Sequence, residues 1–182
     1  MGADQPMVPR RRGADAVHVL SLLRRSLLTV AVASLALTAT ASANTSHAGW
    51  PEIDGLLVMH KTDESGELRG VPERHNELLG GHGNDVIHAG TAGDVLWGDY
   101  KPSGQPETQL DQLIGGPGKD FIYAGHGRNM IVTGAGNDVV HAHFGRGEIH
   151  CGPGATVFLS RNSRRLYELD GCRRISYRTL GY

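Results

Sequence analysis

Aspartate and glycine recur in this chain with a period of nine residues, and together they offer a repeated set of oxygen ligands. Written in nines, residues 71–159 form nine units that keep one register across an insertion at 98–105. The sixth position of the units is acidic in five cases and an amide in two: Asp85, Asp94, Asp111, Asp120 and Asp138, then Asn76 and Asn129. The second and fourth positions are mostly glycine: Gly81, Gly90, Gly116, Gly125, Gly134 and Gly152, then Gly83, Gly118, Gly127, Gly136, Gly145 and Gly154. Glycine turns expose backbone carbonyls and the aspartates add carboxylates, so this pattern favours hard metal cations as partners.

The charge of the chain is unevenly distributed along its 182 residues. Residues 50–159 carry 7 Lys and Arg against 15 Asp and Glu, whereas residues 160–182 carry six Arg against two acidic residues. An acidic body of this kind argues against a nucleic-acid groove and favours cations as partners.

Apolar residues at the eighth position supply the elements that hold these turns. The position is apolar in all nine units: Leu78, Ile87, Leu96, Leu113, Ile122, Ile131, Val140, Ile149 and Phe158. Each is the centre of a minimal β-strand with one inward side chain, and the glycines allow a tight turn between strands. Such a strand buries nothing alone, so two nonapeptides close one coil and successive coils stack as parallel strands. The sequence therefore predicts an all-β parallel solenoid of about four to five coils, with alternate units on opposite sides.

The units GGHGNDVIH (80–88), GGPGKDFIY (115–123) and TGAGNDVVH (133–141) resemble the G-G-x-G-x-D-x-U-x nonapeptide of the hemolysin-type (RTX) calcium-binding repeat family. They are similar in particular to short secreted calcium-binding repeat proteins of actinobacteria. The resemblance implies a right-handed parallel β-roll with Ca²⁺ held between Gly/Asp turns that stack on the same side. It implies these metal ligands: Gly81, Gly83, Asp85, Gly90, Asp94, Asp111, Gly116, Gly118, Asp120, Gly134, Gly136 and Asp138. Metal binding at such turns is expected to drive folding, because without a cation the aspartates of successive coils stack like charges.

The two sides of the predicted roll differ in their acidic residues. Counting units alternately, one side carries Asn76, Asp94, Asp120, Asp138 and Thr156, and the other carries Asp85, Asp111, Asn129 and Gly147. Three consecutive aspartates favour the first side for occupied sites, with about two to four ions in all. On the second side, the insertion is expected to separate Asp111 from Asp85. The alternative is a metal-free solenoid whose Asp and Asn side chains cap turns by local hydrogen bonds.

The first 43 residues have the layout of a secretory signal peptide. Arginines at 10–25 precede an apolar run at 27–40, and the small residues Ala41-Ser42-Ala43 follow. The run is short for a membrane span, although an uncleaved N-terminal anchor is the alternative. Arg24-Arg25 also resembles a twin-arginine signal, so either export route is compatible. The mature chain is expected to be 44–182, secreted and without a further transmembrane segment.

Two flanks complete the predicted mature chain. Residues 44–70 are expected to form a capping strand, and residues 160–182 a basic C-terminal cap on the 71–159 roll. Cys151 and Cys172 are expected to pair in an exported chain and so tie this cap to the roll. The tail arginines either contact an anionic polymer at the cell surface or in a matrix, or remain solvated or pair with the acidic roll.

Other residues give weaker signals of chemistry. Trp97 and Tyr100 beside the insertion are either a ligand platform or a surface stack. The histidines at 88, 141, 143 and 150 favour surface stacking over a zinc site. None of the H-E-x-x-H, G-x-S-x-G or Walker-A patterns occurs. In enzymatic members of the resembled family, the chemistry sits in a separate domain, and the flanks here are too short for one.

These features together predict a secreted calcium-binding module without catalysis of its own. A metal-independent solenoid acting as an adhesin or matrix protein is the main alternative. A small secreted hydrolase with an unrecognised Ser/His/Asp set is a third.

Overall fold

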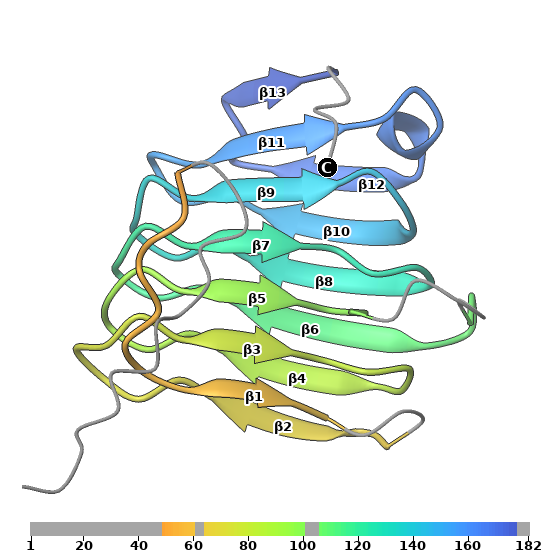
Figure 1. The fold of residues 1–182 in the computed structure, drawn as a ribbon. Helices are drawn as coiled ribbons and strands as arrows, with labels where there is room; N and C mark the ends of the chain where they lie inside the picture. The colour runs from red at the N-terminus through yellow and green to blue at the C-terminus, as the bar shows by residue number, and fades with distance from the viewer. Residues whose placement is uncertain (1–48, 61–63, 101–105, 178–182) are drawn as a thin grey trace, which may run out of the picture. The chain divides into compact units, whose positions relative to one another are not determined.

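A computed structural model describes residues 49–60, 64–100 and 106–177, which form short strands in two sheets (Figure 1). One sheet contains β1 (Leu57–Met59), β3 (Glu77–Leu79), β5 (Val95–Trp97), β7 (Phe121–Tyr123), β9 (Val139–Ala142), β11 (Thr156–Leu159) and β13 (Arg174–Ser176). The other contains β2 (Gly66–Arg69), β4 (Asp85–His88), β6 (Leu110–Ile114), β8 (Arg128–Val132), β10 (Arg146–His150) and β12 (Tyr167–Asp170). In the described part of the chain, the helical segment is the 3₁₀ turn η1 (Ser163–Arg165), and no helix is long and apolar enough to cross a membrane. The predicted signal peptide at 1–43 lies outside the described residues.

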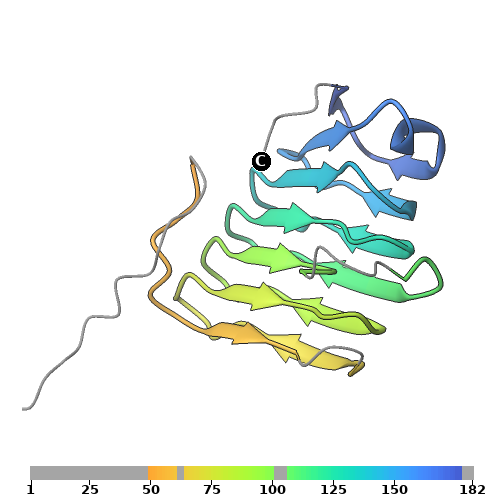
Figure 2. The same cartoon turned by 45° about the vertical axis from the view of Figure 1, so that its right-hand side comes forward.

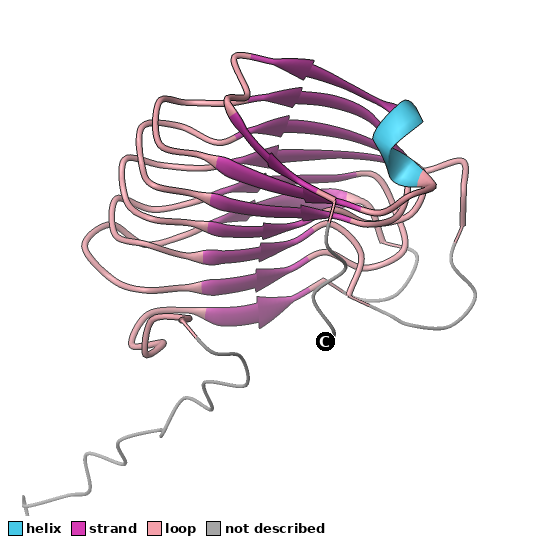
Figure 3. Ribbon diagram, turned by 90° about the horizontal axis from the view of Figure 1, so that it is seen from above, coloured by secondary structure: helices cyan, strands magenta, loops and turns pink. Residues whose placement is uncertain are grey.

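Consecutive strands alternate between the two sheets, so the chain winds as a parallel β-solenoid (Figure 3). Strand partners are 18 residues apart where two nonapeptides close a coil, as for Leu110 and Arg128. The insertion lengthens one coil to 26 residues, because Val95 pairs with Phe121. The inward column is fully buried at eight of its nine predicted positions, from Leu78 to Ile149. The predicted all-β parallel solenoid is therefore confirmed.

The solenoid has about six turns, more than the four to five coils expected from the nonapeptides. The additional strands are β1 and β2 before the repeats and β12 and β13 after them, and each pairs in parallel with the adjacent repeat strand. They lack the Gly/Asp columns but still direct apolar side chains such as Val58, Leu68 and Leu169 into the core. An inward apolar residue and a free strand edge are therefore sufficient to extend the stack.

The last repeat unit is shifted by one residue relative to the expectation. β11 pairs Val157 with Val140 and Phe158 with His141. Val157 is fully buried in the inward column, whereas the Phe158 ring stacks on the His141 ring at a centroid distance of 5.2 Å. The expectation that Phe158 faces the core is therefore wrong, because the turn before β11 is one residue shorter than its neighbours.

The segment 49–56 runs along the outer face of the seven-stranded sheet before the chain enters β1 (Figures 1 and 2). Trp50 and Ile53 are almost buried, and they pack with Phe121 and Tyr123 of β7. The indole N–H of Trp50 donates a hydrogen bond to the Tyr123 hydroxyl at 2.9 Å. The chain before β1 therefore covers part of a sheet face as well as leading into the first strand.

Aromatic rings form an outward column on the same sheet. Trp97 stacks on Tyr123 at 4.0 Å between ring centroids, and Tyr123 stacks on His141 at 4.7 Å. His88 and His150 lie on the opposite sheet, where each approaches an acidic side chain. The expected stacking thus holds for His141 but not for His88 and His150, because alternate units fall on opposite sheets.

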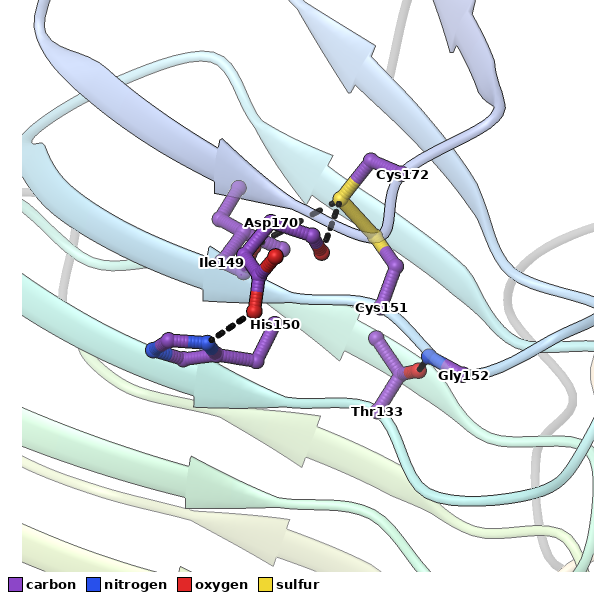
Figure 4. Close-up of a disulfide and its surroundings, with 7 residues drawn as sticks. All are labelled: Thr133, Ile149, His150, Cys151, Gly152, Asp170 and Cys172. Carbon is purple, nitrogen blue, oxygen red and sulfur yellow. Dashed lines mark hydrogen bonds and ion pairs between the residues drawn. A yellow bond between two sulfur atoms is a disulfide. The ribbon is translucent and has the colours of Figure 1, made fainter.

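The C-terminal residues continue the solenoid and are covalently tied to it (Figure 4). Cys151, directly after β10, forms a disulfide with Cys172, which follows β12. The predicted pairing is confirmed. The bridge fastens the last coil to the preceding one, so the tail forms strands of the stack.

Candidate metal centre

The Asp and Asn residues of the repeats form two ladders inside the solenoid, one at each side where the chain turns between the sheets. We call Asn76, Asp94, Asp120 and Asp138 the first ladder, and Asp85, Asp111 and Asn129 the second ladder. All seven residues are at most 1% exposed. The turns that carry the first ladder connect β2 to β3, β4 to β5, β6 to β7 and β8 to β9. The side assignment made from unit counting therefore agrees with the observed turns.

Carboxylates of the first ladder link each coil to the one before it. Asp120 Oδ1 accepts a hydrogen bond from the Asp94 amide at 2.7 Å, and Asp138 Oδ1 accepts one from the Asp120 amide at 2.9 Å. Asp94 Oδ1 accepts both the amide and the side-chain Nδ2 of Asn76. The second oxygen of Asp120 closes its own turn by accepting the Gly116 amide at 2.6 Å. The aspartates thus act as turn caps and coil-to-coil acceptors, which are the hydrogen bonds that the metal-free alternative predicts.

The second ladder follows the same geometry but ends differently. Asp111 Oδ1 accepts the Asp85 amide at 3.1 Å, so the insertion does not separate these residues and that expectation is wrong. The coil with the insertion is longer, but β4 and β6 keep their register, with Ile87 paired to Leu113. At the far end, the Asn129 side chain donates a hydrogen bond to the Tyr167 hydroxyl at 3.1 Å. The next position of this ladder is Gly147, which pairs with Asn129 on one side and with Tyr167 on the other. The Tyr167 hydroxyl therefore reaches Asn129 across a rung that has no side chain.

Glycines allow the turns of the first ladder to approach each other closely. A Cβ added to Gly136 would overlap the carbonyl oxygen of Gly118, and one added to Gly134 would overlap that of Gly116. Backbone carbonyls of one turn therefore point at the glycines of the next. This arrangement explains why glycine recurs at the second and fourth positions, and it places carbonyl oxygens beside the carboxylates.

Burial shifts the protonation of the ladder aspartates. Burial raises the pKa of Asp111 to about 8 and that of Asp120 to about 7, and the neighbouring ladder carboxylates add to both shifts. It also raises the pKa of Asp94 and Asp138 above the ordinary value, although backbone amides lower it in part. A buried negative charge without a cationic neighbour is costly, which is the physical reason for each shift.

Few cationic groups balance these charges. Within residues 49–60, 64–100 and 106–177, the ion pairs of Lys and Arg do not include a ladder aspartate. His60 reaches one of them, with Nδ1 at 2.7 Å from Asp85 Oδ1. The ladders therefore present several closely spaced carboxylates whose charge a proton or a bound cation must compensate.

The residues present fit a hard cation with oxygen ligands. Asp138 Oδ2 is buried and accepts no backbone amide of the described residues, although the Thr133 hydroxyl is close to this carboxyl. The glycine carbonyls of adjacent turns lie next to the ladder. In the same part of the chain, no group of three or more His, Cys, Asp or Glu side chains is arranged to hold a metal by itself. A cation between these turns would therefore take carbonyl oxygens together with one or two carboxylates, a donor set that suits Ca²⁺.

The structure also shows a cluster of buried polar residues that lie outside the repeat pattern. Asp99, in the insertion, has a fully buried side chain between His82 and His126. Gln109 lies nearby and is 4% exposed. None of these residues occupies the sixth position of a unit, so the nine-residue period does not point to them. The recurrence of Gly-His-Gly at 81–83 and 125–127, on either side of the insertion, is the signal that could have found this cluster.

The comparisons with known proteins agree with the repeat pattern. Residues 73–99 and 110–140 match the family model of the RTX calcium-binding nonapeptide repeat, in four copies. Repeats of this family bind Ca²⁺, and proteins that carry them are typically extracellular. Neither the curated proteins nor the solved structures include a match to the chain.

Proposed function

Because residues 73–140 carry four RTX calcium-binding nonapeptide repeats, we propose that this chain is a secreted module whose folding is coupled to extracellular Ca²⁺. It acts as a binding or structural module without catalysis of its own. The ligands are the carbonyls and carboxylates of the Gly/Asp turns, including Asp85 and Asp111, with the turns of Asp94, Asp120 and Asp138 as the principal sites. The leader at 1–43 directs export, and the basic tail is available to an anionic polymer at the cell surface.

One observation supports this proposal most strongly. Five ladder aspartates are fully buried, and in the described part of the chain no Lys or Arg pairs with them. Buried carboxylates in this number destabilise a fold unless they are neutralised. A divalent cation between adjacent turns neutralises two carboxylates at once, so its binding energy becomes folding energy.

A metal-independent solenoid is the second candidate. The hydrogen bonds from the amides of Asp94 and Gly116 to Asp120 favour it, because they hold the coils together without a metal. In that case the far-UV circular dichroism spectrum of the chain stays the same in excess EDTA. The calcium proposal instead expects the β-sheet spectrum to appear on titration with Ca²⁺.

Replacing Asp120 with Ala separates the two candidates. The calcium proposal expects the Ca²⁺ midpoint of folding to rise at least about tenfold, because the carboxylate serves turns on both of its faces. A purely structural Asp120 loses about 1 kcal/mol for each missing hydrogen bond, and it loses this equally in Ca²⁺ and in EDTA. Thermal unfolding under both conditions measures the difference.

Asp170→Ala is the matched control, because it removes an aspartate whose side chain is 82% exposed. It should leave the Ca²⁺ midpoint unchanged. Equal losses for Asp120→Ala with and without Ca²⁺ would reject the calcium role of this residue.

A further inference from the structure

Asp99 is a buried carboxylate that the repeat pattern does not explain. It follows Gly98 directly after β5, and its side chain is 0% exposed. Its Oδ1 lies 3.7 Å from His82 Nε2, and its Oδ2 lies 3.9 Å from His126 Nδ1. His82 and His126 belong to the turns before β4 and β8, on the side of the second ladder. The insertion therefore places a carboxylate between two stacked turns.

Some buried oxygens at this place have no hydrogen-bond partner in the described part of the chain. They are Oε1 of Gln109 and Oδ2 of Asp111. Among the described residues, the carboxylate oxygens of Asp99 have only long contacts, to the His82 and His126 rings and to the Gln109 amide. By contrast, both oxygens of Asp120 and of Asp94 accept hydrogen bonds from backbone amides. Buried polar atoms almost always have a hydrogen-bond partner in folded proteins, so a cluster of buried oxygens without one indicates a binding site for a ligand.

These oxygens come from side chains that lie close together. A Cβ added to Gly125 would be 2.5 Å from the Cβ of Asp99 and 3.2 Å from Oδ2 of Asp111. Gln109 reaches the same turn, because its Nε2 donates to the His126 carbonyl at 3.5 Å. Burial raises the pKa of the Asp99 carboxyl, and the nearby Gln109 amide lowers it in part, so these two side chains are close neighbours.

A cavity lies beside this cluster. It has a volume of about 260 Å³, and His82 and Gln109 are among the residues that line it. Gln109 therefore lies between the cavity and the two buried carboxylates, which do not line the cavity themselves.

We propose that Asp99, Gln109 and Asp111 form an additional Ca²⁺ site, built by the insertion on the side of the second ladder. Two carboxylates and one amide carbonyl are hard oxygen donors, and the two carboxylates balance the charge of one divalent ion. The site deepens the proposed function, but Asp99 and Gln109 lie outside the sixth-position column. The insertion is then a ligand-bearing element that replaces a regular Gly/Asp turn.

Counting bound ions on the full chain tests the site. Native mass spectrometry at saturating Ca²⁺ should show one ion fewer on Asp99→Asn than on the unmodified chain. Asn keeps the shape of the side chain and removes its charge, and Asp170→Asn serves as the exposed control that keeps the full number. Far-UV circular dichroism in Ca²⁺ should show that Asp99→Asn still folds.

A second variant keeps the test decisive if Asp99→Asn does not fold. Gln109→Met keeps the size of the side chain and removes its oxygen, so it should weaken one class of Ca²⁺ site at least about fivefold in a titration. An unchanged ion count for Asp99→Asn, or an unchanged titration for Gln109→Met, overturns the site. The proposed Ca²⁺ site is also overturned if Zn²⁺ binds there at a lower concentration than Ca²⁺ does, because the neighbouring imidazoles would then be the ligands.

The failure of this site differs from the failure of the proposed function. Loss of ions in Asp120→Ala together with a full count in Asp99→Asn rejects the additional site alone. A chain that binds no Ca²⁺ at all rejects both.

Discussion

An aspartate such as Asp120 combines two roles at the scale of the single residue. Its oxygens accept amide hydrogen bonds that fix a turn and join it to the preceding coil, as Asp120 does for Gly116 and Asp94. Its charge opposes the same arrangement, because it is buried beside like charges. The hydrogen bonds position the carboxylates, and the unbalanced charge makes the position favourable for a cation. Under the calcium proposal, a proton and a calcium ion are therefore alternative ways to stabilise one structure.

This reasoning predicts how the metal-free chain responds to pH. The pKa of Asp111 is raised to about 8 and that of Asp120 to about 7, from 3.8 in an exposed carboxyl. Between about pH 4 and pH 8 the folded state therefore binds more protons than the unfolded state, and stability falls as pH rises. In EDTA, the free energy of unfolding should be larger at pH 5 than at pH 8, by on the order of several kcal/mol. The far-UV spectrum should therefore show more β-sheet at pH 5, even if the metal-free chain is unfolded at pH 8. Thermal unfolding by circular dichroism at the two pH values measures the difference.

Asp120→Asn is the control for this pH dependence. Burial lowers the pKa of His143, so this residue makes the folded state less stable as the pH falls, opposite to the aspartates. The Asp120→Asn control retains this contribution of His143. The variant should show a smaller fall between pH 5 and pH 8 than the unmodified chain. Saturating Ca²⁺ should abolish the fall, because the ion replaces the protons. A metal-free chain that is more stable at pH 8 than at pH 5 would contradict the assignment.

At the scale of the element, the turns are specified by how closely their backbones approach. Gly136 has no positive φ, so its need for glycine comes from the Gly118 carbonyl that occupies the space of a Cβ. Gly134 has both constraints, with a φ of 87° and a carbonyl against it. The same close approach brings carbonyl oxygens toward the ladder. Turn geometry and, in our proposal, metal ligation thus depend on the same glycines.

Replacing Gly136 with Ala should therefore destabilise the stack. The added methyl group forces two turns apart, and we expect a loss of about 3 kcal/mol in the free energy of unfolding in Ca²⁺. Gly66→Ala is the comparison variant, because its Cβ would meet a side chain, the His60 ring at 2.9 Å, and not a backbone carbonyl. It should cost less than Gly136→Ala, about 1 kcal/mol, part of which comes from moving His60 away from Asp85. Urea unfolding of both variants measures the two losses of free energy. Similar losses would show that the close approach of the turns does not matter.

The sequence predicts the repeat elements well, and it does so for a physical reason. Each unit repeats the same local demands, so the inward column from Leu78 to Ile149 and both ladders follow from the period. The shift that turns Phe158 outward could not be predicted, since a turn shortened by one residue leaves no mark in composition. Strands such as β1 and β12 form because the stack offers them an edge to pair with, and this edge exists only in three dimensions.

The same limit applies to the candidate site. Asp85, Asp94, Asp111, Asp120 and Asp138 are visible as a column, whereas Asp99 stands in an insertion where no period applies. Its burial results from the turns of the coils before and after it. Asp111 likewise remains beside Asp85 because strand pairing, and not distance along the chain, sets its neighbours.

At the scale of the whole described unit, residues outside the repeats protect the solenoid at both flanks. At the C-terminal end, the Cys151–Cys172 bridge closes a loop with a sequence separation of 21, which contributes about 3 kcal/mol by restricting the unfolded chain. At the N-terminal flank, apolar side chains of the chain before β1 protect the outer face of the sheet. Segment 49–56 covers the outer face of β5 and β7, a surface that water would otherwise reach.

The N-terminal flank yields a prediction about where the stable unit begins. A chain that starts at Asn44, the expected mature end, retains Trp50 and should unfold at the same temperature as the full chain. Trp50→Ala should lower the free energy of unfolding by about 3 kcal/mol, because it removes an indole that packs edge-on against Trp97 and Tyr123. Trp50→Phe keeps a ring and loses mainly the hydrogen bond to the Tyr123 hydroxyl, so about 1 kcal/mol is expected. Thermal and urea unfolding of these chains in Ca²⁺ provide the measurement. If Trp50→Ala unfolds like the unmodified chain, segment 49–56 contributes nothing to stability, and the repeats stand without it.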